Sequence, residues 1–133
     1  MNPKRAYQEA AISGATPVRL TILLYDQIMQ DVSRAAGALS DAQIEKCAQE
    51  IGHAVAVIGY LQATLRHKNN GARDIAANLA RFYTMLREKL MEAQVRSSRQ
   101  ILAELQQQLT EVRDAWIKVE VDQSGRGDWP ALP

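Results

Sequence analysis

The sequence lacks the features that mark secreted and membrane-inserted proteins. It holds a single cysteine, Cys47, so no disulfide can form within the chain, and its first residues contain no unbroken apolar stretch of the kind that a secretory signal requires. No apolar run approaches the roughly 20 residues that span a bilayer. We therefore expect a protein of the reducing cytoplasm that does not insert into a membrane.

An excess of one sign of charge is also missing. The 133 residues include 16 Lys and Arg against 15 Asp and Glu, which gives a formal net charge of +1, and both signs are scattered along the chain. Attraction of a polyanion needs a basic patch or a large net charge. The sequence therefore argues against nucleic acid as a partner.

Aromatic residues are scarce, at 5% of a chain that is 47% hydrophobic. Ala, Leu, Gln, Arg and Glu dominate instead, and these residues favour helices over strands. Apolar residues recur every three or four positions, which is the spacing of one face of a helix. This spacing predicts an all-α protein with helices at residues 16–39, 41–67, 74–95 and 98–120.

Short connections between these helices predict an elongated, antiparallel, up-down four-helix bundle, because helices joined by few residues must lie side by side. A cap followed by Pro, or a Ser with Gln three residues later, is a typical helix start. Such signals occur as Thr16 with Pro17, Ser40 with Gln43 and Ser97 with Gln100.

Two segments fall outside the predicted bundle. Residues 1–15 place Tyr7 and Ile12 among alanines, enough for one apolar face, so we expect an amphipathic N-terminal segment. Residues 121–133 contain two Gly and two Pro without any period, so we expect a flexible tail.

Residue patterns for catalysis, metal binding or cofactor binding are missing. Neither His53 nor His67 has a Cys or carboxylate cluster at metal-ligand spacing, and no phosphate-binding glycine motif occurs. We therefore expect no enzyme, no cofactor and no metal site. A histidine phosphotransfer domain that uses His53 is an alternative for a helical bundle, but it needs Lys and Gly where this chain has Ala56 and Val57.

The predicted helices carry more apolar residues than one seam of a bundle uses. A second apolar stripe lies beside the first on three of them, and it has two interpretations. The residues widen the core, or they hold a helix of another protein, a task that suits Met and Tyr side chains. They are Ile22, Tyr25 and Met29, then Val57 and Tyr60, then Tyr83 and Met85.

A set of short segments resembles one known family. The segments are Tyr7, Ala15-Thr16-Pro17, Leu20, Leu23-Leu24-Tyr25-Asp26, Gly71, Ile75-Ala76, Asn78-Leu79, Tyr83, Leu90, Ala93, Arg113 and Ala115-Trp116. Together they resemble the flagellar export chaperones of the FliS family. Two departures stand out, since Arg66 follows Leu65 where the family usually has Asp, and Ser97, Ser98 and Arg99 replace a Lys and an acidic residue.

The resemblance implies a cytoplasmic type III export chaperone without a cofactor. Such a protein binds the disordered C-terminal segment of flagellin, prevents premature polymerisation and keeps the subunit competent for export. It also implies that residues 1–15 act as a displaceable cover of the binding groove. The residues expected to contact the guest are Tyr7, Ile12, Ile22, Tyr25, Asp26, Met29, Val57, Tyr60, Leu79 and Tyr83.

Other partners remain open at this point. The same grooves suit a helical adaptor that binds another amphipathic partner, such as an anti-sigma factor or a component of the export gate. Without a guest, two copies of the chain could also pair as a homodimer through their apolar stripes.

Overall fold

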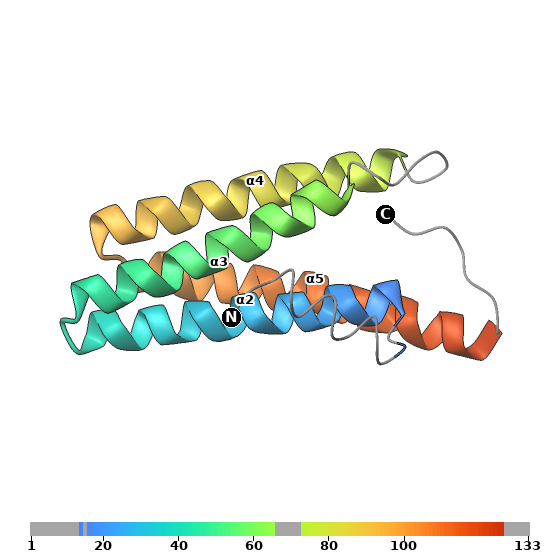
Figure 1. Ribbon diagram of the computed structural model, residues 1–133, viewed down its shortest axis with the longest axis horizontal. Coiled ribbons are helices and arrows are strands. Elements are labelled where there is room, and N and C mark those ends of the chain that lie inside the picture. The colour runs from blue at the N-terminus through green and yellow to red at the C-terminus, as the bar shows by residue number, and fades with distance from the viewer. Residues whose placement is uncertain (1–13, 15, 66–72, 127–133) are drawn as a thin grey trace.

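The computed structural model describes residues 14, 16–65 and 73–126, and within these residues the chain forms four α-helices (Figure 1). The predicted fold class, an all-α four-helix bundle, is confirmed. The predicted contacts of Tyr7 and Ile12, and Gly71 of the segments that resemble the family, lie outside the described residues. The helices are α2 (Pro17–Ser40), α3 (Ile44–Leu65), α4 (Arg73–Arg96) and α5 (Arg99–Arg126).

The helices form a closed square in cross-section. Backbones approach each other in the pairs α2–α3, α3–α4, α4–α5 and α5–α2, whereas the diagonal pairs stay apart. The packing is most extensive between α2 and α3 and least extensive between α4 and α5. Figure 1 shows the long axes running side by side in an elongated molecule. Short links impose the antiparallel order, as predicted.

The start of α2 agrees with the sequence prediction. Thr16 has an extended backbone conformation, and its Oγ1 accepts a hydrogen bond of 3.1 Å from the backbone N–H of Arg19. Pro17 is the first helical residue. The side chain therefore satisfies one of the N–H groups that a helix start leaves unpaired.

The connection between α2 and α3 differs from the predicted capping box. Ser40 is still helical, and its hydroxyl donates to the carbonyl of Ala36 at 3.2 Å. Ala42 has a positive φ of 57°, and the carbonyl of Gln43 accepts the first bond of α3, from Cys47 N at 3.0 Å. Helix α3 therefore begins at Ile44, three residues later than predicted, because residues 41–43 form the turn in which the chain reverses direction.

The connection between α4 and α5 shifts the predicted cap by one residue. Ser98, not Ser97, is the cap, since its Oγ accepts a hydrogen bond of 3.1 Å from Ile101 N. Ser97 instead has a φ of 50° and makes the turn. Two adjacent serines make the choice ambiguous from sequence, and the turn geometry decides it.

Helix α5 continues past the predicted end at residue 120 to Arg126. The predicted flexible tail therefore begins with helix, although Gly125 lies within it. Gln123 is buried, which indicates that the inward face of α5 extends into these last turns. The remainder, residues 127–133, lies outside the described residues.

Among the described residues, no helix has the length and apolar character to cross a membrane.

The core runs along the centre of the bundle and is aliphatic except for three large aromatic side chains, Tyr25, Tyr83 and Trp116. The largest fully buried side chains include Tyr25, Tyr83, Ile22, Ile28, Ile51, Ile58, Leu86, Leu90, Leu102, Leu105 and Leu109, and Trp116 is 7% exposed.

Candidate partner-binding surface

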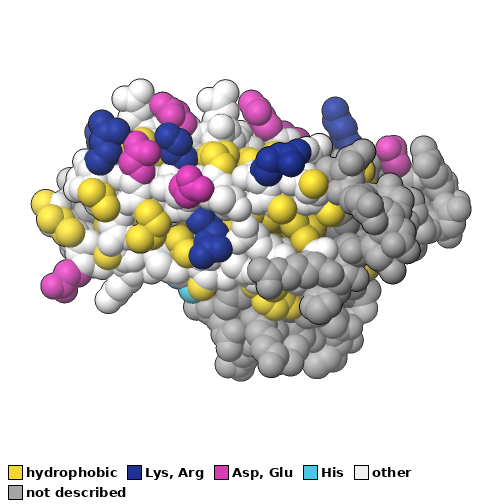
Figure 2. All heavy atoms as spheres, turned by 90° about the horizontal axis from the view of Figure 1, so that it is seen from above, with side chains coloured by type: hydrophobic (Ala, Val, Ile, Leu, Met, Phe, Trp, Pro, Cys, Tyr) yellow, Lys and Arg dark blue, Asp and Glu magenta, His cyan; other side chains and the backbone are white. Residues whose placement is uncertain are grey.

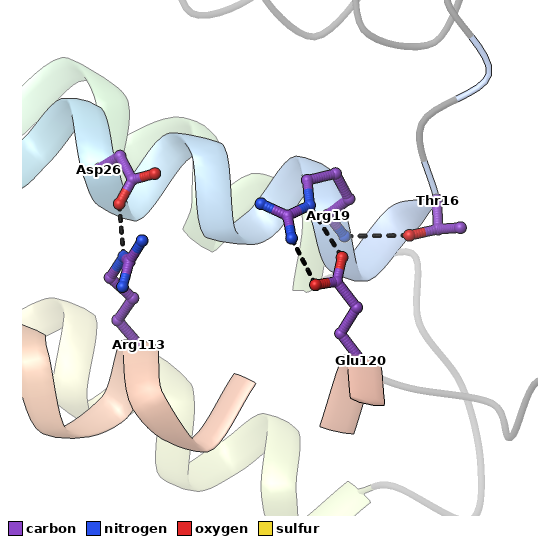
Figure 3. A network of polar contacts seen from close by, with 5 residues as sticks. All are labelled: Thr16, Arg19, Asp26, Arg113 and Glu120. Atoms are coloured by element: carbon purple, nitrogen blue, oxygen red, sulfur yellow. Dashed lines mark hydrogen bonds and ion pairs between the residues drawn. The ribbon is translucent and has the colours of Figure 1, made fainter. Parts of the chain in front are cut away.

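Two ion pairs join α2 to α5 along one seam (Figure 3). Arg19 makes a two-point contact with Glu120, including a bond of 2.8 Å from Nε to Oε2. About two turns further along α2, the Nε of Arg113 donates to Asp26. This hydrogen bond raises the pKa of the Arg113 guanidinium. The seam fixes the register between the two helices, which apolar packing alone specifies less tightly.

A pair of tyrosines crosses the centre of the bundle. The hydroxyls of Tyr25 on α2 and Tyr83 on α4 are 2.9 Å apart, and the rings meet edge to face with centroids separated by 6.2 Å. Burial raises the pKa of Tyr25 to about 12, an effect that contacts with Tyr83 and the Trp116 indole partly offset. Burial also raises the pKa of Tyr83. Both hydroxyls therefore stay neutral and hold the diagonal helices together.

A buried carboxylate lies between α2 and α3. Asp31 is 1% exposed, and its Oδ2 is 2.5 Å from Nδ1 of His53. Its other oxygen accepts a bond of 2.9 Å from Nε2 of Gln27, one turn earlier on the same helix. Buried carboxylates need such partners. This arrangement gives His53 a structural contact within the bundle, and nothing in it favours phosphotransfer.

The structure separates the predicted contact residues into two groups. Ile22, Tyr25, Val57 and Tyr83 are fully buried in the core, as the interpretation of a widened core expects. The others among the described residues are half-buried: Asp26, Met29, Tyr60 and Leu79. Asp26 already binds Arg113 within the bundle.

Apolar side chains also reach the outer surface. Figure 2, which looks onto the side where α4 lies, shows hydrophobic groups emerging between Lys, Arg, Asp and Glu side chains. On α4 the exposed fraction is 52% for Ile75, 50% for Met91 and 82% for Val95. Leu23 on α2 and Val121 on α5 are exposed as well. Contact with another protein is one way to cover such groups.

The match with a protein family covers most of the chain. The family described as Flagellar protein FliS matches residues 1–123. The chain belongs to the FliS family. This confirms the family to which the sequence segments pointed.

Three relatives illustrate the similarity. The flagellar secretion chaperone FliS of Bacillus subtilis (strain 168) is 30% identical over 115 residues, 86% of this chain and 84% of the relative. The flagellar secretion chaperone FliSB of Pseudomonas aeruginosa is 32% identical over 120 residues, 87% of this chain and 94% of the relative. The FliS of Salmonella typhimurium, named likewise, is 26% identical over 112 residues, or 84% and 82%.

Metal and thiol chemistry find no support in this FliS protein. Within residues 16–65 and 73–126, no group of three or more His, Cys, Asp or Glu side chains is placed to hold a metal ion. Cys47 is buried, and burial raises the pKa of its thiol, so the reactive thiolate is disfavoured.

Sequence reasoning missed the polar groups inside this FliS bundle. Asp31 lies three residues after Ile28 and four before Ala35, so the helical period itself places its carboxylate on the buried face. Gln123 lies seven residues after Trp116 and is buried for the same reason. Extending the helical period of each apolar stripe to the polar residues that fall on it predicts that both Asp31 and Gln123 are buried.

Proposed function

We propose that this protein is a cytoplasmic chaperone of the flagellar type III export pathway. It binds the disordered C-terminal segment of flagellin, prevents premature polymerisation and keeps the subunit competent for export. The observation that carries this proposal is the FliS family match over residues 1–123, together with relatives named flagellar secretion chaperones.

The described helices offer suitable contacts for such a guest. Met29 on α2, Tyr60 on α3 and Leu79 on α4 pack against the core while keeping part of their surface open. An amphipathic segment that folds on binding can bury its apolar face against side chains of this kind. Binding then buries the apolar face of the flagellin segment, through which free flagellin subunits would otherwise associate.

The buried residues have a different role in this proposal. Ile22, Tyr25, Val57 and Tyr83 are inaccessible in the described structure. They support the half-buried residues from beneath, and a guest reaches them only after a rearrangement that exposes them. Initial contact therefore falls to the half-buried and exposed side chains, with Leu79 and Tyr60 foremost.

The test is calorimetric titration of the full chain with a synthetic peptide of the flagellin C-terminal segment from the same bacterium. We expect saturable one-to-one binding, a negative heat-capacity change and added helicity in circular dichroism. A scrambled peptide of the same composition is the control. Absence of binding to a chain shown to be folded would refute flagellin as the guest.

A substitution pair on α4 tests the surface. Leu79→Gln should weaken peptide binding by about tenfold, because it replaces a half-buried apolar contact with an amide. Ala77→Gln, at an exposed position two residues away, is the matched control and should bind as the unmodified chain does. Equal effects of both variants would contradict a contact at Leu79.

A further inference from the structure

The inward stripe of α5 ends on an amide. Leu102, Leu105, Leu109 and Trp116 follow each other at helical spacing and are buried. The same period places Gln123, seven residues after Trp116, on the same face, and its side chain is 4% exposed. A position of this kind is normally apolar. The bundle therefore finishes one of its stripes with an uncharged polar group.

The amide of Gln123 has unused hydrogen-bonding capacity. Within the part of the chain that the structure describes, neither Nε2 nor Oε1 has a hydrogen-bond partner. A primary amide has two N–H donors and a carbonyl acceptor, and buried groups of this kind are nearly always paired in native proteins. A partner that pairs with this amide therefore satisfies hydrogen bonds that the chain itself leaves unmade.

The surroundings hold this amide in a defined position. Glu120, one turn earlier on α5, contacts Arg19 through both of its oxygens, and the first turn of α2 that carries Arg19 is capped by Thr16 (Figure 3). The ion pair therefore fixes the turn from which Gln123 projects.

The chemistry of the amide selects its partner. A carboxylate only accepts hydrogen bonds and an ammonium group only donates them, whereas a peptide group does both. We infer that Gln123, once the rearrangement that opens buried positions to the guest has exposed its amide, binds a main-chain peptide group of the bound guest, donating from Nε2 to its C=O and accepting at Oε1 from its N–H. Peptide groups inside a helix already use both functions, so the guest passes Gln123 in extended conformation or at a helix end.

This inference rests on the proposed function, because the guest is the flagellin segment. The experiment compares the full chain with Gln123→Leu, which keeps the size of the side chain and removes its hydrogen bonds. Gln107→Leu, at an exposed position of the same helix, is the matched control. In titrations with the flagellin C-terminal peptide we expect about tenfold weaker binding for Gln123→Leu and none of this loss for the control.

Peptides methylated at single backbone nitrogens locate the partner group. At one position, methylation should weaken binding to the unmodified chain by about tenfold and leave binding to Gln123→Leu unchanged, because the same hydrogen bond is already lost. In urea unfolding of the chain without peptide, Gln123→Leu should raise the unfolding midpoint, since it removes an unpaired buried amide.

The outcomes separate the two proposals. If the unmodified chain binds the peptide and Gln123→Leu binds equally well, the inference fails and the proposed function stands. If the unmodified chain does not bind, both fail. A lower unfolding midpoint for Gln123→Leu would mean that the amide is paired in the free protein, by water or by the chain itself, and would overturn the inference. If the binding loss of Gln123→Leu is matched by substitution of an Asn or Gln side chain of the guest, and by methylation of no backbone nitrogen, the main-chain assignment is overturned.

Discussion

The hydrogen bond between Tyr25 and Tyr83 should make the two residues strongly interdependent for stability. Tyr25→Phe removes one hydroxyl and leaves the other, on Tyr83, buried without its partner at 2.9 Å. Tyr83→Phe leaves the Tyr25 hydroxyl beside the Trp116 indole, which still interacts with it. The two single substitutions therefore differ although each removes one oxygen atom.

The expected magnitudes follow from the cost of an unpaired buried hydroxyl. Tyr25→Phe should lower the free energy of unfolding by about 2 kcal/mol, and Tyr83→Phe by about 1 kcal/mol. The double substitution to Phe removes both polar groups and preserves the edge-to-face ring pair, so its cost should be no more than about 1 kcal/mol. The coupling energy is then about 2 kcal/mol in favour of the pair.

Urea unfolding followed by circular dichroism measures these values in all four proteins of the cycle. A loss of 2 kcal/mol should also lower the melting temperature by roughly 6–8 °C in a domain of this size. Additive costs, with the double variant as unstable as the sum of the singles, would refute the conclusion that the hydroxyls pair within the bundle.

Three further predictions concern the same interior and the seam beside it. The pKa of Tyr25 is about 12 in the folded protein and about 10 in the unfolded chain. The neutral hydroxyl therefore stabilises the fold fully below pH 10, and about 3 kcal/mol of the free energy of unfolding is lost as the pH rises from 10 to 12. Tyr25→Phe should make the fall in unfolding free energy over that range less steep. His53→Leu should cost about 3 kcal/mol in urea unfolding by leaving the Asp31 carboxylate buried with one partner, and Asp31→Leu in the same chain should restore most of it. Arg113→Met should cost less than about 1 kcal/mol, and the difference should shrink in 1 M NaCl, because its ion pair is partly open to solvent.

Local sequence signals predict the helices well wherever a single residue decides the local geometry. Thr16 and Pro17 define the start of α2 as predicted, because a cap and a fixed φ act within one turn. The serines near the later starts fail as signals, since Ser40 bonds backward within its helix and Ser98 replaces Ser97 as the cap. The sequence cannot resolve these alternatives because serine serves equally well in both roles.

Burial was harder to predict than helix position. Tyr25 and Tyr83 read as surplus apolar groups from their spacing, yet each satisfies the hydroxyl of the other in the core. Such a pair joins residues from diagonal helices, so no periodicity within one helix reveals it. Asp26 likewise is used by Arg113 on α5, which the order of residues along α2 does not indicate. The contacts of the guest are still predictions for the same reason.

The distribution of polar contacts indicates which neighbouring helices separate most easily when a guest binds. Ion pairs join α2 to α5, and the Asp31 carboxylate joins α2 to α3. Between α3 and α4, Gln62 donates a hydrogen bond to Thr84 and accepts one from Arg87. Among the described residues no side-chain hydrogen bond or ion pair joins α4 to α5, and these helices are also the least extensively packed neighbours. Since the seams opened at lowest cost are those with the fewest contacts, hydrogen exchange should be fastest along α4 and should slow there when peptide binds.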